Sequence, residues 1–575
     1  MKALAAGPAA GRLRWERWVA YSPVLLAVGI LLPRLLSPQF GLFDDGYTIS
    51  VVRQVGAGDL DMLWEPGAAR SRPVYWLYYA VLYRLAGPNP FWFFVGNAVL
   101  FAATTAGLIY LVRSGGATPR RSFLTGLLFV LAGPVVESYL TLSKPEPLQL
   151  SLITGTLVLL LRPPRPRTRV LGIGVFLVAA LLLLLADLTK ETSLVIVPIS
   201  AIWLGAAWAW RRFRRGPTDL NRPAALLLAS ALAGIAFFVL RNRFSTFGLP
   251  EDAYAGNYLL EGQRLLASAI RWTGWSLRDF GYLGPLILGG ALFSLSRGAF
   301  LTNPGLLASA VWMGGWVAVY LPWVYTVEYY LLPFALGASV AAAYLADEIL
   351  SRFPSPDGWR RMTAALCLGL AGLLLVLSVV NNVSSANQQI MVDEANAEAL
   401  QLVSATLPAS SELLVNLQFP GEYVEQIRLH LIHTYGRPDI RVDYVRMEEL
   451  PGEVAGARPS YVLEAIVENQ PLLTVRMGAV EPSVREWNRQ LEGFLAESGV
   501  LVGRIERELQ LYNVNFIRLL CPLMSARGFC EADEPLLDRR TFSYGWELYR
   551  IADGSPEALA EGSRLATVRR TASWE

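Results

Sequence analysis

Two adjacent carboxylates are the residues whose type and spacing point most directly to chemistry. Asp44 and Asp45 lie in the stretch LFDDGYTI, shortly after the first apolar run of the chain. One carboxylate can take a proton from a hydroxyl group, while its neighbour points elsewhere and meets a cation or an arginine. The structural alternative is a helix cap, because an aspartate before a helix often accepts from its free N–H groups. A cap explains one aspartate and leaves the other unexplained.

Two lysines form the second unusual feature. Of the 50 lysine and arginine residues, only Lys2, Lys144 and Lys190 are lysines. Lys144 lies beside Glu146 in SKPEP, and Lys190 is followed by Glu191 in TKETS. An interfacial anchor can be arginine or lysine, whereas a compact ammonium that meets a phosphate as a point charge need not tolerate the exchange. The pattern favours a functional role for Lys144 and Lys190 over simple anchoring.

The composition is that of a membrane protein. The 575 residues are 53% hydrophobic and 17% charged, and the mean hydropathy is +0.38. The net charge of +3 is small and no basic tract is interleaved with aromatic residues, which argues against nucleic acid as a partner. Apolar runs suited to a hydrocarbon core about 30 Å thick predict about eleven transmembrane helices. They lie near 17–36, 91–112, 122–138, 147–161, 170–187, 193–210, 223–240, 280–296, 305–322, 330–349 and 363–382.

Arginine-rich links set the expected orientation, because basic residues concentrate in the cytoplasmic loops of multi-pass proteins. Such links precede the first span and recur around 113–121, 162–169, 211–215 and 352–361. We therefore expect a multi-pass protein of the plasma membrane with a cytoplasmic N-terminus. The outer side then carries the loops 37–90, 137–146, 187–192, 241–279 and 323–329 and everything after residue 382.

This topology gathers the unusual charges on the outer face. The acidic pair falls in the first outer loop, Lys144 and Glu146 in the second, Lys190 and Glu191 in the third, and Glu328 in the last. A charge at the centre of a span costs about 2.5–3.5 kcal/mol on insertion scales, so these residues stay at the surface. Their shared side predicts a polar cavity there.

Two further segments of the outer side are aromatic. The segment 73–86 is apolar but short, and we interpret it as interfacial or re-entrant. The long loop 241–279 carries Arg241 and Arg243 near its start and tryptophans near its end. Aromatic residues of this kind suit either a helix at the membrane interface or a lid over the site.

The remaining residues, 383–575, predict an extracytoplasmic α/β domain, and residues 1–382 the transmembrane domain. Strands are expected near 411–417, 440–445, 460–467, 472–479 and 544–552, with helices over 422–433 and 484–499. No nucleophile triad, phosphate loop or metal motif occurs in this part. We interpret His430 and His433 as surface residues. Cys521 and Cys530 are either a disulfide, as an extracytoplasmic location permits, or two free thiols.

The first two thirds of the chain resemble the GT-C class of polytopic glycosyltransferases, which use polyprenyl-phosphate-linked sugars. The resemblance rests on LFDDGYTI, then RSRPVYWLYYAVLYRLAG, then TKETSLVIVP and EYYLLPF, in this order and on one side. It covers roughly residues 17–350. The branch is that of protein O-mannosyltransferases and lipid A aminoarabinose transferases. The chain has Ser71-Arg72-Pro73 where that branch often has Lys-Pro-Pro or His-Pro-Pro, and it lacks the WWD motif of oligosaccharyltransferases.

The resemblance implies an inverting transfer of a sugar to a cell-envelope glycan, lipid or protein hydroxyl. Asp44 or Asp45 is then the base, with Asp44 favoured. The leaving phosphate needs positive charge. The implied donors are Lys190, Lys144, Arg72, Arg241 and Arg243, and the implied supporting carboxylates are Glu146, Glu191 and Glu328. No cofactor is required. A divalent cation such as Mg²⁺ or Mn²⁺ is compatible with the site, with Asp45 as a candidate ligand.

A transporter or flippase of lipid or polysaccharide, with an accessory outer domain, is the competing class. Such a protein would carry charged residues along the middle of several spans. Here the predicted spans are nearly free of charge and the charges cluster at one surface. The pattern therefore favours an enzyme.

Overall fold

The structure is a computed structural model, and its description is restricted to part of the chain. The described residues are 7–42, 44–65, 71–162, 169–214, 220–244, 260–294, 304–323, 327–352, 358–416, 420–444, 460–467, 492–493, 495–496, 499–514 and 537–551. The two cysteines at 521 and 530, the strand expected over 472–479 and the tail after 556 lie outside these ranges.

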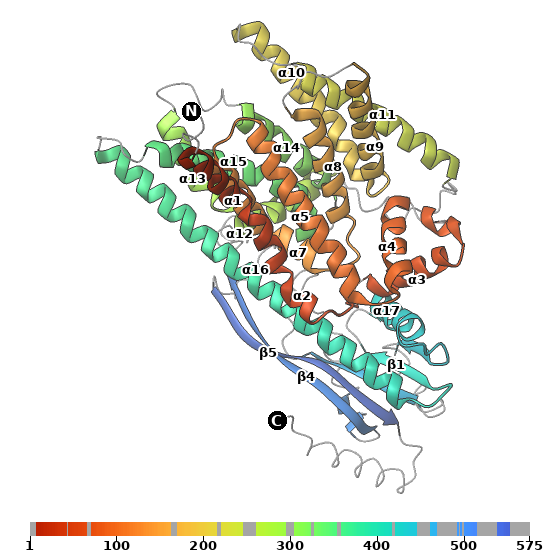
Figure 1. The fold of residues 1–575 in the computed structure, drawn as a ribbon. Helices are drawn as coiled ribbons and strands as arrows, with labels where there is room; N and C mark the ends of the chain where they lie inside the picture. The colour runs from red at the N-terminus through yellow and green to blue at the C-terminus, as the bar shows by residue number, and fades with distance from the viewer. Residues whose placement is uncertain are drawn as a thin grey trace.

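Most of the described chain is helical, and a helix overlaps each predicted span (Figure 1). The bundle contains α1 (Gly7–Ile30), α2 (Leu32–Leu36), α5 (Pro90–Ser114), α6 (Pro119–Val130), α7 (Gly133–Leu140), α8 (Glu146–Leu161), α9 (Arg169–Asp187), α10 (Ile196–Arg214), α11 (Asn221–Phe244), α13 (Leu283–Ser294), α14 (Pro304–Tyr320), α15 (Leu332–Arg352) and α16 (Gly358–Thr406). The short 3-10 helices η2 (Glu191–Val195) and η4 (Glu328–Leu331) lead into α10 and α15.

Length and composition qualify five of the described helices as membrane spans, or six if one bent pair is counted as a single span. The five are α5, α10 with η2, α11, α15 with η4, and α16. Further apolar helices, which are too short for the same criterion, occupy Trp18–Ile30, Glu146–Leu161, Leu171–Asp187, Leu283–Leu292 and Gly305–Tyr320. The number of about eleven spans therefore stays a prediction.

The bent pair is α6 and α7, which together occupy the predicted span near 122–138. The two helices meet at an angle of 57°. Ala132 between them has an extended backbone, and Pro134 follows near the start of α7. Proline has no N–H to continue the hydrogen-bond ladder of α6, so the chain turns there. The break directs α7 and its Glu137 along the outer end of the bundle.

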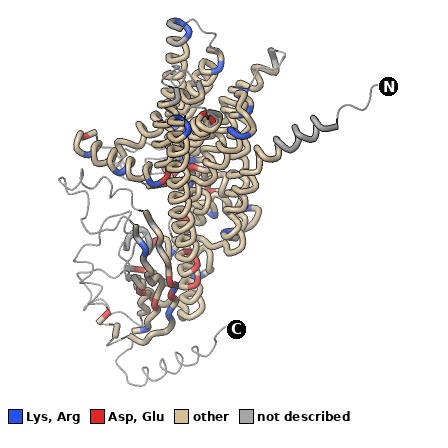
Figure 2. The backbone as a smooth tube through the Cα atoms, turned by 90° about the vertical axis from the view of Figure 1, so that its left-hand side faces the viewer, with Lys and Arg blue, Asp and Glu red and all other residues tan. Residues whose placement is uncertain are grey.

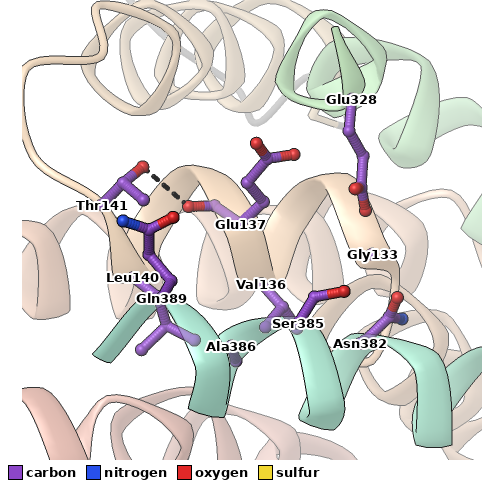
Figure 3. Close-up of a pocket in the computed structure, with 10 residues that line it drawn as sticks. All are labelled: Gly133, Val136, Glu137, Leu140, Thr141, Glu328, Asn382, Ser385, Ala386 and Gln389. Atoms are coloured by element: carbon purple, nitrogen blue, oxygen red, sulfur yellow. Dashed lines mark hydrogen bonds between the residues drawn. The ribbon is translucent and has the colours of Figure 1, made fainter. Parts of the chain in front are cut away.

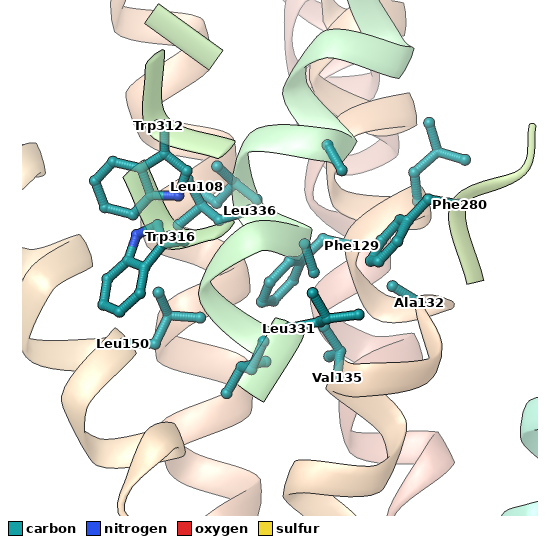
Figure 4. Packing of buried hydrophobic residues seen from close by; sticks show 14 of the residues in the cluster. Leu108, Phe129, Ala132, Val135, Leu150, Phe280, Trp312, Trp316, Leu331 and Leu336 are labelled. Carbon is teal, nitrogen blue, oxygen red and sulfur yellow. The ribbon is translucent and has the colours of Figure 1, made fainter. Parts of the chain in front are cut away.

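Large apolar side chains hold the bundle together. Figure 4 shows Trp312 and Trp316 of α14 packed near Leu108 and Leu150, and Phe129 packed near Leu331 and Phe280. These side chains are almost fully buried. Since lipid is as apolar as the core, such close packing is what stabilises one arrangement of helices over another.

Four further elements pack beside the helices of the bundle. They are α3 (Asp45–Gly56), η1 (Leu60–Trp64), α4 (Pro73–Ala86) and α12 (Gly262–Phe280). The segment 73–86, expected to be interfacial or re-entrant, is one helix over the same residues, and it packs against α3 and α5. In α12, Trp272 is buried and its indole nitrogen donates to the carbonyl of Tyr320 at 3.2 Å. This contact fixes α12 against α14.

A five-stranded sheet forms the second part of the molecule, in the order β2-β1-β3-β5-β4. The strands are β1 (Glu412–Asn416), β2 (Arg441–Tyr444), β3 (Ser460–Val467), β4 (Gly499–Val514) and β5 (Leu537–Ile551). β1 pairs in parallel with β2 and β3, whereas β5 pairs antiparallel with β3 and β4. The helix α17 (Pro420–His433) follows β1 and confirms the helix expected over 422–433. The long strand β4 was not predicted.

One helix joins the two parts. α16 runs without interruption from Gly358 to Thr406, well past the last predicted span, and its second half packs along β4 and β5 (Figure 1). Asn381 accepts a hydrogen bond from the backbone N–H of Val514 at 2.9 Å, so the contact begins at the end of the predicted span. Figure 2 shows the acidic residues mostly gathered beside the sheet and sparse along the bundle.

Candidate active site

Asp45 is a buried anchor. It is the first residue of α3 and is 4% exposed. Ser143 Oγ donates to its Oδ1 at 2.5 Å, and the backbone N–H of Gly41 donates to its Oδ2 at 2.7 Å. Burial raises the pKa of Asp45 to about 7, although both hydrogen bonds act in the opposite direction. Each oxygen already has a donor within the protein, which leaves Asp45 poorly placed to serve a substrate.

Asp44 is the carboxylate that faces outward. Its side chain is 39% exposed, and its Oδ2 lies 3.7 Å from Nζ of Lys144. The residue occupies the N-cap position of α3, but its side chain makes no capping hydrogen bond. The cap alternative is therefore wrong for the Asp44 carboxylate. Of the two aspartates, Asp44 is the one whose oxygen atoms can reach a bound hydroxyl.

Backbone strain is concentrated around this pair. Asp44 has φ of 66° and Ser143 has φ of 58°, both in the left-handed region that residues other than glycine rarely adopt. Such a residue costs about 1–3 kcal/mol and tends to occur at functional sites. The hydrogen bond from Ser143 to Asp45 links the two strained turns, which aims the Asp44 and Lys144 side chains at each other.

Both lysines lie on aromatic rings of the segment EYYLLP. Lys144 Nζ is 4.4 Å from the ring centre of Tyr329, and Lys190 Nζ is 4.3 Å from that of Tyr330 and 6.0 Å from that of Tyr329. Ring faces attract cations, and more so when solvent is excluded. Both ammonium groups therefore lie within 6.0 Å of the centre of the Tyr329 ring, although the two lysines are 46 residues apart in the chain. These tyrosines were not singled out from the sequence, where only the adjacent Glu328 was.

Lys190 also forms an ion pair with Glu146. Glu146 begins α8, where the positive end of the helix dipole favours a carboxylate. Burial by itself would lower the pKa of Lys190, but the carboxylate of Glu146 outweighs it and the net shift is upward. Lys190 therefore remains a cation at neutral pH. The second oxygen of Glu146 is buried without a hydrogen-bond partner, as is Oε2 of Glu191.

Arg72 lies near the same region but has a partner already. Its guanidinium donates to both carboxylate oxygens of Glu65, at 3.3 and 3.2 Å, and covers the rings of Tyr75 and Trp76. The next residue but one, Val74, donates through its N–H to the carbonyl of Leu188, which ties this turn to the third outer loop. Arg72 therefore lies near the loop that carries Lys190, and its positive charge is balanced by Glu65.

The remaining predicted residues have other partners. Arg241 and Arg243 are in the last turn of α11, and the guanidinium of Arg243 covers Phe244, which stacks on Trp64 of η1. Glu328 accepts from Arg278 at 3.2 Å. Glu328 and Glu137 line a pocket of about 40 Å³ between α7, η4 and α16 (Figure 3). That volume has room for a few water molecules.

No cation site is defined by the described ranges. Within them, no group of three or more His, Cys, Asp or Glu side chains is arranged to hold a metal ion. Asp45, the candidate ligand, is committed to Ser143 and Gly41. Metal dependence is therefore a question for experiment.

The expectation of two solvated histidines is wrong for His430. This residue is 2% exposed, its Nε2 lies 3.1 Å from the carbonyl oxygen of Gly41, and its Nδ1 lies 3.1 Å from Thr434 Oγ1. Burial lowers the pKa of His430 to about 4. His433 is more accessible and its Nδ1 lies 3.1 Å from Arg53 NH1. The contact between His430 and Gly41 could not be predicted from the sequence, because the two residues are 389 positions apart.

The fold and site together are those of a helical, membrane-type protein that carries a cluster of charged side chains and a mixed sheet. No family model matches the chain, and no curated protein matches it by sequence. Among solved structures, the apo oligosaccharyltransferase of Archaeoglobus fulgidus is similar over 72% of this chain, at 11% identity and a TM-score of 0.46. This chain spans 64% of the length of that protein.

A second similar structure is ArnT from Cupriavidus metallidurans bound to undecaprenyl phosphate. The match has 12% identity and a TM-score of 0.46, and it covers 86% of this chain and 97% of that one. A third is the oligosaccharyltransferase AglB of Archaeoglobus fulgidus in complex with an inhibitory peptide and a dolichol-phosphate, at 11% identity and a TM-score of 0.45. That match covers 79% of this chain and 70% of the other. Because all these TM-scores are below 0.5, the functional assignment rests on the residues of this chain.

Proposed function

We propose that this protein is a membrane glycosyltransferase that moves a sugar from a polyprenyl-phosphate donor to a hydroxyl group at the outer membrane face. The observation that carries the proposal is the Asp44–Lys144 ion pair at 3.7 Å, with Lys190 Nζ 6.0 Å from the ring centre of Tyr329, which Lys144 also contacts. A base and two cations are the groups that this transfer needs. The GT-C resemblance of the sequence supports the same reading.

The proposed step is a single displacement. Asp44 removes the proton from the acceptor hydroxyl as its oxygen forms a bond to the anomeric carbon of the sugar. The bond between that carbon and the phosphate oxygen breaks, and the polyprenyl phosphate leaves with the electron pair. Attack from the side opposite the phosphate inverts the configuration at the anomeric carbon.

The lysines stabilise the charge that develops on the leaving phosphate. Preorganised donors in a site sheltered from water are worth more than the same donors in bulk water. Lys144 is 7% exposed and Lys190 is 12% exposed, and tyrosine rings hold both in place. The lipid tail of the donor would lie against the apolar outer surface of the helices. Residues 1–382 form the catalytic transmembrane domain in this proposal, and the later residues form the outer domain.

Transport is a weaker explanation of these charges. The site carboxylates lie at helix ends, since Glu146 begins α8, Glu191 begins η2 and Glu328 begins η4. A translocation path would need polar groups deeper in the bundle. A surface site for chemistry accounts for their positions more simply.

The test is transfer by the purified full-length protein in lipid nanodiscs. Radiolabelled polyprenyl-phosphate hexoses and pentoses are supplied with glycan, lipid and peptide acceptors. We expect one donor class to lose its label to an acceptor with inverted anomeric configuration. Failure of every donor, in protein whose thermal unfolding is cooperative, would reject the assignment.

A further inference from the structure

The loop that carries the acidic pair touches the outer domain directly. Gln426 Oε1 of α17 accepts a hydrogen bond from the backbone N–H of Tyr47 at 3.0 Å. His430, one turn further along, bonds the carbonyl oxygen of Gly41 at 3.1 Å. Leu42 is 4% exposed and belongs to the apolar core of the sheet domain rather than to the bundle. The outer domain therefore binds this loop on both sides of Asp44.

The contact continues to the buried aspartate. Gly41 accepts from His430 through its carbonyl and donates through its N–H to Oδ2 of Asp45 at 2.7 Å. Nδ1 of His430 lies 3.1 Å from Thr434 Oγ1, which orients the imidazole ring. A neutral His430 with its proton on Nε2 fits this arrangement, because a carbonyl oxygen only accepts. The position of Gly41 is thus fixed from the α17 side and from the Asp45 side.

The approach of α17 to α3 leaves no room for a side chain at residue 46. A Cβ atom on Gly46 would lie 2.9 Å from the backbone oxygen of Gln426 and 2.9 Å from its Oε1. A Cβ atom on Gly56, at the other end of the same helix, would meet nothing within 4 Å. An alanine at residue 46 therefore disturbs the contact with α17, whereas an alanine at residue 56 changes only the intrinsic stability of α3.

A second element of the outer domain holds the start of the loop. Arg34 of α2 donates to Asp393 of α16 at 2.5 Å and to the carbonyl of Leu140 at 2.8 Å. Gln389 donates to the other oxygen of Asp393 at 2.9 Å. The second half of α16 and α17 thus clamp residues 34–47 from two sides.

We propose that the outer domain is a positioning device for the acidic pair, in which His430 and Gln426 of α17 hold residues 41–47 so that Asp44 faces Lys144. The proposal rests on the glycosyl transfer proposed above. His430 and Gln426 act through the backbone and touch no substrate, so they are positioning residues. The hydrogen bonds reach the backbone at residues 41 and 47, which flank the strained turn at Asp44. A displacement of about 1 Å at a catalytic group can cost a hundredfold in rate.

Two matched pairs of variants test the proposal in full-length protein in nanodiscs. The first pair is Gly46→Ala, which forces α17 away from α3, and Gly56→Ala, which changes the same helix in open space. The second pair is His430→Phe and His430→Gln. Phenylalanine keeps a ring but has no N–H to donate to Gly41, whereas glutamine keeps an N–H that can donate. We expect Gly46→Ala and His430→Phe to lower kcat at least tenfold with donor KM within twofold. Gly56→Ala should match the wild type, and His430→Gln should recover most of the rate.

Wild-type kcat in both Gly46→Ala and His430→Phe would overturn the proposal. So would a loss confined to the amount of folded protein, with kcat per folded molecule unchanged. If Gly46→Ala fails to fold, the His430 pair decides alone. Amide hydrogen exchange over residues 40–47 gives a readout independent of activity. Exchange over these residues should be faster in His430→Phe than in His430→Gln, even if no sugar donor is turned over. Equal exchange in the two variants would contradict the proposal that His430 positions this loop.

Discussion

Asp44 and Lys144 approach each other to 3.7 Å from two different outer loops, and Asp44 is the more exposed partner. Their sequence neighbours Asp45 and Ser143 are joined by a buried hydrogen bond of 2.5 Å. The two neighbouring pairs therefore differ in role. The buried pair fixes the backbone of both turns, and the other pair sets the exposed Asp44 carboxylate beside the sheltered ammonium of Lys144.

The two aspartates are expected to differ sharply on substitution. Asp44→Asn removes the proposed base but keeps the shape, so transfer should fall at least a hundredfold while thermal unfolding stays at the wild-type temperature. Asp45→Ala leaves Ser143 and Gly41 without their shared acceptor and should cost about 1–3 kcal/mol of stability. Transfer assays and thermal unfolding of both variants separate the roles. Wild-type activity in Asp44→Asn would refute the assignment of the base.

The lysines should not accept arginine. In Lys144→Arg and Lys190→Arg the charge is retained, but the planar guanidinium does not reproduce a compact ammonium held on a tyrosine face. We expect donor KM to rise or kcat to fall about tenfold in each variant. Arg212→Lys, which alters an exposed residue of α10, serves as the control and should behave as the wild type. Equal activity in all three would remove the case for a specific ammonium.

Asp45 and His430 should affect stability with opposite dependence on pH. The pKa of Asp45 is raised to about 7, so its contribution is complete below about pH 4 and is lost as the pH rises towards 7. The pKa of His430 is lowered to about 4, so its contribution is present above about pH 6.5 and is lost as the pH falls towards 4. The two partly cancel in the wild type.

Single substitutions should reveal how each residue makes the stability depend on pH. Between pH 4 and 6.5, Asp45→Asn should become more stable relative to the wild type as the pH rises, because only the His430 contribution remains. His430→Phe should show the reverse trend. Thermal unfolding at half-unit pH steps measures both. Parallel curves for the two variants would show that these groups do not carry the shifted values.

Transfer should survive removal of divalent cations. The proposed phosphate site uses two lysines, and each Asp45 oxygen already has a protein donor. We expect activity within twofold of the untreated enzyme after chelation with EDTA. A loss of activity restored by Mg²⁺ or Mn²⁺ would place a metal in the donor site instead.

The sequence was sufficient for the outline of this molecule. Apolar runs located the helices of the bundle, and the segment 73–86, interpreted as interfacial or re-entrant because it is short, is a separate helix. The rarity of lysine singled out Lys144 and Lys190, which do lie on neighbouring tyrosines. These signals are local, so one sequence reveals them without an alignment.

Several features of the site depend on contacts between distant residues, and these could not be predicted from the sequence. Which aspartate is exposed depends on Ser143, 98 residues away, and on its unusual φ. The burial of His430 depends on Gly41, 389 residues away. β4 escaped prediction because most of its described side chains are partly or fully exposed, which leaves little apolar alternation. The break between α6 and α7 was not predicted, because it lies inside an apolar run that is long enough to be a single span.

The clamp on residues 34–47 also constrains how the protein is made. Arg34 leaves the ribosome early, yet its partner Asp393 is 359 residues later in the chain, and α17 follows still later. During synthesis residues 34–47 are therefore without these partners until the second half of α16 and α17 have been made. A truncated or stalled chain would carry every proposed catalytic side chain and still lack an assembled site.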